Sequence, residues 1–168
     1  MASRQEIEGS LLRTNVTNDD LRRLGHGAVP VLIDIFLHDS TEWKDNKRRM
    51  SLHALGLLGD ERAVEFLIAT AENTDEEDWL RKAAVRSLGF AEHRKAIDYL
   101  GAMLDHPDFG FKQSAVTALG HSSNPESDRL LEKAKTIDDE RIQRQIVRAE
   151  AGKQEGQGPD DQGEVFIV

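Results

Sequence analysis

The sequence contains no cysteine, few aromatic residues and no long apolar run. Without cysteine, the chain forms no disulfide, has no thiol nucleophile and cannot bind zinc through sulfur. Its most apolar stretch, AVPVLIDIFL, is much shorter than the roughly 20 residues that a membrane-spanning helix needs. The first residues, MASRQEIEGSLL, lack the apolar segment of a secretory signal. These absences predict a cytoplasmic protein.

Basic residues are also scarce relative to acidic ones, because 22 Lys and Arg face 31 Asp and Glu and leave a net charge of −9. A negative field of this size repels the phosphate groups that dominate nucleic-acid affinity, and it repels anionic lipid surfaces. We therefore expect no nucleic-acid partner and no membrane partner. The abundant leucine and alanine, with 5% aromatic and 32% charged residues, favour helices over sheets.

The sequence repeats itself with a period of about 32 residues, which is marked by a glycine that usually follows leucine. Successive marker glycines are 31, 33, 31 and 32 residues apart. The markers are Gly25, Gly56, Gly89, Gly120 and the weaker Gly152, which follows Ala151. Such regular intervals indicate one structural unit that is repeated along the chain.

Each unit has the pattern of a helical hairpin. Apolar residues one and four positions before the glycine, with a small residue five before it, define one face of a first helix. We expect the glycine to be a left-handed C-cap that ends this helix. Apolar residues seven, eight and eleven positions after it define a second helix. Because one hairpin cannot bury its apolar face alone, the pattern predicts an all-α solenoid of stacked antiparallel hairpins.

Capping helices are expected at both ends of this solenoid, which we place at residues 1–152. Ser3 and Glu6 have the spacing of a capping box, and Arg148 interrupts the apolar column in the last unit. Residues 153–168 form a Gly-rich, acidic segment that we expect to be flexible. It ends on Val165, Phe166, Ile167 and Val168, which suggest a short binding motif, a segment that folds back onto the solenoid, or a terminus without a role.

The unit DEEDWLRKAAVRSLGFAEHRKAIDYLGAMLDH resembles a HEAT-like repeat of the short bacterial and archaeal type. The resemblance covers roughly residues 15 to 152. Repeats of this short type are similar to those in the lyases that attach bilin chromophores to light-harvesting proteins. The resemblance implies an α/α superhelix and says little about function, because such repeats serve many purposes.

No catalytic constellation is visible in the sequence. It has no nucleophile elbow, phosphate-binding glycine loop or dinucleotide fingerprint. None of the six histidines has metal-ligand spacing, and the His-Glu pairs of HEAT-repeat di-iron hydroxylases are absent. We therefore expect no catalytic residue, no metal site and no cofactor.

A basic residue stands eight positions before the glycine in four units: Arg48, Arg81, Lys112 and Arg144. An acidic residue precedes each of them by three or four positions: Asp45, Asp78, Asp108 and Glu140. This spacing favours ion pairs that brace the helices. A stripe that binds anions is the alternative.

The second helices are expected to line the concave surface, as they do in similar solenoids. Half-exposed large residues ten positions after the glycine are candidate interface anchors, namely Phe66, Tyr99 and Leu130. The charged candidates around them are Arg62, Lys95, Asp98 and Arg129. Filling of the seam between units is the alternative role for the large residues.

The favoured function is a non-enzymatic scaffold or adaptor that binds a protein or peptide on its concave surface, as a monomer or weak oligomer. An inhibitor or immunity protein against a basic toxin is one special case. The alternative is a bilin-lyase-like or other enzyme-assisting subunit. A DNA-glycosylase-like function is disfavoured by the acidic charge.

Overall fold

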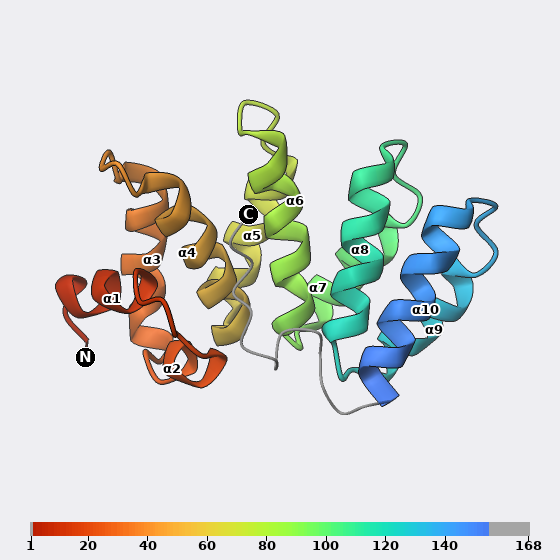
Figure 1. Ribbon diagram of the computed structural model, residues 1–168, viewed down its shortest axis with the longest axis horizontal. Coiled ribbons are helices and arrows are strands. Elements are labelled where there is room, and N and C mark those ends of the chain that lie inside the picture. Colours follow the sequence, from red (N-terminus) through yellow and green to blue (C-terminus); the bar gives the residue numbers. More distant parts are fainter. Residues whose placement is uncertain (1, 155–168) are drawn as a thin grey trace.

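The computed structural model describes residues 2–154, and these form an array of helices with no β-strand among them (Figure 1). The helices follow one another as α1 (Arg4–Leu11), α2 (Asn18–Arg22), η1 (His26–Ala28), α3 (Val29–His38), α4 (Lys44–Leu58), α5 (Glu61–Glu72), α6 (Asp78–Ser87), η2 (Leu88–Phe90), α7 (Arg94–Met103), α8 (Phe109–His121), α9 (Pro125–Ala134) and α10 (Glu140–Gln154). The predicted all-α solenoid is confirmed.

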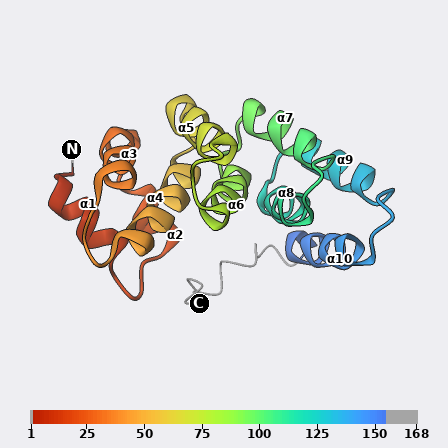
Figure 2. The same ribbon diagram turned by 90° about the horizontal axis from the view of Figure 1, so that it is seen from above.

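Two rows of helices make up the solenoid. The first helices of the units (α2, α4, α6, α8 and α10) form one row, and the second helices (α3, α5, α7 and α9) form the other. Neighbours in the first row pack together more extensively than neighbours in the second row. Figure 2 shows the consequence, because the array is arched and the first row lies on its inner side. We call the two rows the inner row and the outer row.

The expectation that the second helices line the concave surface is therefore wrong. A row that packs more closely is shorter, and the array bends toward it.

A continuous apolar core lies between the two rows. The repeated apolar positions of the inner helices are fully buried in three consecutive units, at Leu52 and Leu55, Val85 and Leu88, Val116 and Leu119. Leu67, Leu100 and Leu131 of the outer helices meet them and are equally buried. Burial of each such side chain stabilises the folded state by roughly 1.5–3 kcal/mol, so the packing of each unit against its neighbours contributes several kcal/mol to folding.

The marker glycines Gly56, Gly89 and Gly120 do not end the inner helices in a left-handed conformation. Of the described glycines, only Gly25 and Gly59 have a positive φ. A Cβ at Gly56 would lie 2.2 Å from the Ser87 carbonyl oxygen, and a Cβ at Gly89 would lie 2.2 Å from that of Ala118. The prediction of a left-handed C-cap is thus wrong for Gly56 and Gly89. Glycine stands there because the next inner helix passes against its backbone.

The basic residues eight positions before the marker glycines, which we call the basic column, brace the array where their side chains are partly buried. Arg48 Nε donates to the Phe36 carbonyl oxygen at 3.1 Å, and Arg81 Nε donates to that of Ala71 at 3.0 Å. Each arginine thereby ties an inner helix to the C-terminal end of the preceding outer helix, where a cation also meets the helix dipole favourably. The bracing role is confirmed for these two arginines, although Arg48 pairs with Glu76 rather than Asp45.

Both ends of the described array are covered. The predicted capping box of Ser3 and Glu6 begins α1, which buries Ile7 and Leu11 against the first hairpin. At the other end, α10 buries Ile142 and Ile146 against α8. None of the helices in residues 2–154 combines the length and the apolarity needed to cross a bilayer.

A buried ion pair ties α3 to α4. Lys47 Nζ lies 2.7 Å from Asp39 Oδ2, and the two side chains are only 6% and 4% exposed. Burial opposes the ionisation of Asp39, but Lys47 and the Thr41 backbone N–H outweigh it and lower the pKa of the carboxyl to about 2. The charged form of Asp39 therefore stabilises the folded state.

The substitution Gly89→Ala tests the close approach of α8 to the end of α6. The added methyl meets the backbone of Ala118, so α8 has to move, and we expect a loss of about 1–3 kcal/mol of unfolding free energy. Thermal unfolding followed by circular dichroism then shows a melting temperature lower by roughly 3–10 °C. Gly9→Ala is the matched control, because Gly9 is a helical glycine with open space around it, and its melting temperature does not fall. An unchanged melting temperature for Gly89→Ala would contradict the close approach.

The substitution Asp39→Asn tests the buried ion pair. Because the pKa of Asp39 is lowered in the folded state, its contribution is complete above pH 4 and is lost as the pH falls toward 2. We expect the variant to lose about 2 kcal/mol at pH 7 and to show a weaker fall in stability between pH 4 and 2. Urea unfolding across this pH range measures both effects. Asp98→Asn, at an exposed carboxylate, serves as the control.

Candidate functional site

The predicted anchors Phe66, Tyr99 and Leu130 lie on the outer row, where each is half-buried. The ring of Phe66 packs edge-on against Phe36 of α3, with 5.3 Å between centroids. Leu130 of α9 packs against Gly101 of α7. Burial raises the pKa of the Tyr99 phenol to about 12, with a smaller contribution from Glu72. These contacts place Phe66 and Leu130 in seams between successive outer helices, and a binding role for the row stays a prediction.

The charged residues predicted around these anchors all have local partners. Arg62 Nη2 lies 2.5 Å from Asp60 and also donates to the His26 carbonyl oxygen. Lys95 Nζ lies 2.5 Å from Glu61 and 2.8 Å from Glu65 of the preceding outer helix. Arg129 pairs with Glu126 at 3.0 Å, and Asp98 lies 3.7 Å from Arg94. The outer surface is thus electrostatically balanced.

Two further sets of predictions concern other parts of the chain. The apolar terminal residues Val165, Phe166, Ile167 and Val168 lie outside the described residues. Within residues 2–154, no three His, Asp or Glu side chains gather in a way that could hold a metal ion.

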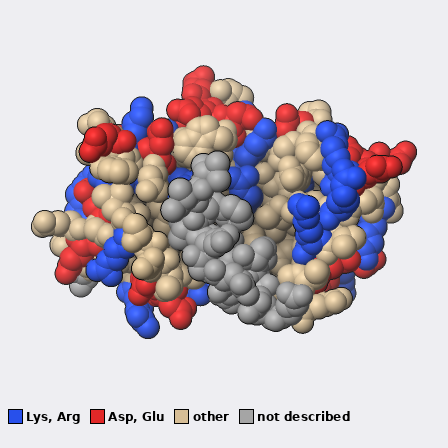
Figure 3. All heavy atoms as spheres, viewed as in Figure 1, with Lys and Arg blue, Asp and Glu red and all other residues tan. Residues whose placement is uncertain are grey.

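The inner row presents a different surface, which the sequence analysis did not single out. Its partly exposed side chains stand seven and three positions before Gly56, Gly89 and Gly120, and seven positions before Gly152. These positions hold Arg49, Lys82, Gln113 and Gln145, and His53, Arg86 and Thr117. Figure 3 views this face and shows Lys and Arg gathered over α6 and α10, with uncharged groups over α8 between them and acidic groups mostly toward the edges. The inner face is therefore basic although the whole chain is acidic.

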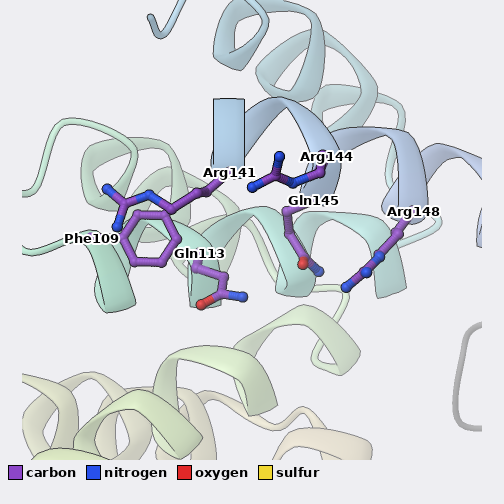
Figure 4. A pocket seen from close by; sticks show the side chains of 6 residues that line it. All are labelled: Phe109, Gln113, Arg141, Arg144, Gln145 and Arg148. Atoms are coloured by element: carbon purple, nitrogen blue, oxygen red, sulfur yellow. The ribbon is translucent and has the colours of Figure 1, made fainter. Parts of the chain in front are cut away.

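A shallow groove of about 240 Å³ runs between α8 and α10 on this face. Its lining is shown in Figure 4 and consists of Phe109, Gln113, Arg141, Arg144, Gln145 and Arg148. The arginines and Gln145 share one side of α10, because residues three, four and seven apart lie on the same helix face. No carboxylate lines the groove.

The arginines of the groove are held to different degrees. Arg141 is fixed, because its guanidinium lies 3.8 Å above the Phe109 ring and makes two hydrogen bonds to Asp139, at 3.1 and 2.7 Å. These bonds also lower the pKa of the Asp139 carboxyl to about 2. Arg144 is 67% exposed and has only a loose contact of 3.8 Å with Glu140, which is 94% exposed. A contact of this kind is weak, so the Arg144 guanidinium remains available to a ligand.

The amides of the groove are oriented by neighbouring side chains. Gln145 Nε2 donates to the Thr117 hydroxyl at 3.0 Å and so links α10 to α8 along the inner face. Next to them, Arg86 of α6 donates to the Ser114 hydroxyl at 3.3 Å. Polar bonds between inner helices thus continue the basic surface from α10 to α6.

Aromatic rings cross the inner helices near their C-terminal ends. Phe90 lies between His53 and His121, with ring centroids 5.0 Å and 4.6 Å apart. The three residues come from three successive units, so the rings form a row across α4, η2 and α8. We call His53, Phe90 and His121 the aromatic row.

This surface can recognise an anion whose charges are spread along a chain. A guanidinium presents a planar fork of donors that fits a carboxylate or phosphate, and the glutamine amides add neutral donors and acceptors. The sequence does not reveal this surface directly, for two reasons. The negative net charge of the chain conceals a local basic cluster. In addition, the partly exposed residues seven positions before each marker glycine directly follow the bracing residues eight positions before it, and the two sets are about 100° apart around the helix.

Arg144 and Arg148 did carry a signal in the sequence. Arg148 breaks an apolar column, and Arg144 continues the basic column in the last repeat unit. The sequence analysis explained the first as the polar face of a cap and the second as a brace. The structure places both guanidinium groups in the groove.

Comparisons with known proteins agree with this architecture. Residues 71–151 match the family model of HEAT repeats. Among solved structures, a chain in the complex of CpcE and CpcF of phycocyanin lyase from Nostoc sp. PCC7120 is similar, with a TM-score of 0.54 and 22% sequence identity over 79% of this chain and 86% of that chain. No curated protein matches the sequence significantly. Residues 71–151 are thus similar in sequence to HEAT repeats, and the stacked hairpins of residues 2–154 share the fold of the similar solved chain.

Proposed function

We propose that this chain is a non-enzymatic protein-binding module whose inner face binds an acidic segment of a partner protein. The observation that carries the proposal is the groove between α8 and α10, where three arginines line one side and no carboxylate lies among the lining residues. HEAT-like solenoids offer long surfaces of this kind, on which an extended segment contacts several units in turn.

The arrangement of the arginines supports a peptide ligand. Arg141 stacks on Phe109 and is already paired with Asp139, so it shapes the wall of the groove. Arg144 and Arg148 follow it along α10 and remain exposed. On one side of a helix, residues four apart are about 6 Å apart along the axis, which is close to the spacing of alternate side chains in an extended peptide.

An acidic protein segment suits the groove better than nucleic acid. A protein with a net charge of −9 repels a long polyanion at every point outside the basic face. A short acidic peptide meets only the local field of the groove, because charges beyond about 8–10 Å are screened at physiological ionic strength. The glutamines also match the backbone amides of a peptide.

Binding of a labelled acidic peptide tests the proposal. We expect a fluorescein-labelled octaglutamate peptide to bind the full chain, and the double substitution Arg144→Ala/Arg148→Ala to weaken this binding about tenfold, because two exposed cations are lost. Fluorescence anisotropy titrations measure the dissociation constants at low and at physiological salt. Octalysine and short duplex DNA are titrated in parallel and bind more weakly.

The matched control for this experiment is Arg94→Ala/Arg129→Ala, which removes the same charge from exposed arginines of the outer row. We expect this control to retain the affinity of the unsubstituted chain within about twofold. Equal weakening by both double variants would mean that only the overall charge matters. Tighter binding of DNA than of octaglutamate would also contradict the proposal.

An enzyme-assisting role of the bilin-lyase type is the second candidate, and the similar architecture of a chain in a phycocyanin lyase complex is the observation that favours it. The basic face suits a bilin because the two propionates of this pigment are carboxylates. In this role the chain would present a pigment to an acceptor protein, together with a second subunit.

Co-expression distinguishes the two candidates. If the chain is a binding module, co-expression with a bilin and an apo-phycobiliprotein yields no coloured covalent adduct. Zinc-enhanced fluorescence of the proteins after denaturing electrophoresis detects such an adduct. A coloured acceptor that depends on this chain, and that disappears in the Arg144→Ala/Arg148→Ala variant, would favour the enzyme-assisting role instead.

A further inference from the structure

We propose that the C-terminal segment of this chain, residues 155–168, binds the inner face of its own solenoid and competes there with the partner. This inference rests on the proposed function, because it assigns a built-in competitor to the same basic surface. Three observations carry it: the charge of the segment, the place where it leaves the solenoid, and the apolar residues at its end.

The charge of the segment complements that of the inner face. Residues 155–168 contain four acidic residues and neither lysine nor arginine: Glu155, Asp160, Asp161 and Glu164. The inner face carries Lys82 and Arg86 on α6 and Arg144 and Arg148 on α10; Arg144 and Arg148 line the groove, whereas Lys82 pairs with Asp78 and Asp108. The cations of the outer row are paired with local carboxylates, whereas Arg144 in the groove has only the loose contact with Glu140, so the outer row attracts the segment less.

The solenoid releases the segment beside this surface. The described part of α10 ends at Gln154, and Lys153 in its last turn is fixed by Ser127 at 2.7 Å and Asp128 at 2.6 Å. Equivalent inner helices run in the same direction, so the end of α10 lies at the same end of the array as the ends of α8 and α6 (Figure 1). The segment thus begins at the edge of the inner face.

Its length is sufficient to cross that face. Neighbouring packed helices are about 8–10 Å apart, so α6 lies roughly 20 Å from α10 along the inner row. The six residues from Gln154 to Asp160 span up to about 20 Å when extended, and the eleven residues to Val165 span up to about 37 Å. Asp160 and Asp161 can therefore reach the cations of α8–α10 and α6, and the end of the chain can reach the aromatic row.

The apolar end of the segment also has a complementary surface. Val165, Phe166, Ile167 and Val168 follow the acidic residues directly, and such a run gains free energy when it is removed from water. On the inner face, the half-buried Phe90 stands at the centre of the aromatic row, and its ring contacts lie toward the C-terminal ends of the helices. The order of charges and apolar residues along the segment thus follows the order of arginines and rings from α10 toward α6.

Competition follows from tethering. A segment joined to its binding site through a short linker acts at an effective concentration in the millimolar range. A weak intrinsic affinity is therefore enough for the segment to occupy the face for most of the time. A partner must then displace it, so the affinity measured with the full chain is lower than that of the bare solenoid.

The experiment compares three forms of the protein: the full chain, a chain that ends at Gln154, and the full chain with Glu155→Gln, Asp160→Asn, Asp161→Asn and Glu164→Gln. Residues 2–154 contain the whole described core, so the shortened chain retains its fold, which circular dichroism verifies. We expect the shortened and the neutralised forms to bind labelled octaglutamate about three- to tenfold more tightly than the full chain. The Arg144→Ala/Arg148→Ala substitution removes most of this difference.

A second measurement does not depend on the probe. In nitrogen-edited NMR spectra at low salt, the Nε–H signals of Arg144 and Arg148 shift between the full and the shortened chain, whereas those of Arg94 and Arg129 stay in place. Adding a peptide of residues 155–168 to the shortened chain moves the first two signals toward their positions in the full chain. Adding 0.5 M salt diminishes the shifts, because the charges are screened.

The outcomes separate the two proposals. Failure of octaglutamate to bind any form, together with shifted Arg144 and Arg148 signals, would overturn the proposed function and retain the contact with the segment. Equal octaglutamate binding by all forms, with unshifted signals, would overturn the contact and retain the function. Sedimentation velocity shows a monomer at all concentrations if the segment binds its own chain, and a concentration-dependent dimer would instead assign the contact to a second copy.

Discussion

The close approach of successive inner helices at the marker glycines determines most of this structure. Gly56 and Gly89 let the backbone of the next inner helix come so near that a single methyl group would meet a carbonyl oxygen. Small residues at the facing positions, Ser87 and Ala118, complete these contacts. The inner row is therefore shorter than the outer row, the array bends toward it, and the face that becomes concave is the one formed by the first helix of each unit.

The same packing sorts the charged residues into two functions. At position −8 the side chains turn toward the preceding outer helix, where Arg48 and Arg81 satisfy carbonyl groups and stabilise the stack. Seven positions before the glycine they lie on the inner face and are at least partly exposed, and Lys82 among them pairs with Asp78 and Asp108. In the last unit of residues 2–154, Arg144 is 67% exposed and lines the groove together with Arg148. A basic column that is structural in the middle of the array thus contributes to the proposed binding surface at its end.

The sequence was sufficient for the repeat, the hairpins and the core, because each depends on a periodic pattern within one unit. Leu55, Leu88 and Leu119 were expected to be buried and are. The direction of the curvature was not predictable in this way, since it depends on which of two rows packs more closely. The role of Gly89 was also predicted wrongly, because it depends on packing between units and not on the pattern within one unit. A glycine after an apolar helix face usually ends the helix, and only the neighbouring backbone of Ala118 shows that it is needed for contact. The groove was not predicted because the three arginines that line it are outnumbered in a composition of 31 acidic residues.

The difference between the two rows also determines how this molecule deforms. Backbone-to-backbone contacts at Gly56 and Gly89 leave the inner row little freedom to stretch, whereas the outer helices touch through long side chains such as Phe36 with Phe66 and the Lys95 ion pairs. Elastic bending of the array therefore pivots on the inner row and opens or closes the outer seams. Distances between contact residues along the inner row therefore change little when the array bends. A ligand that spans several units on this face keeps its contacts, while the outer helices move apart or together.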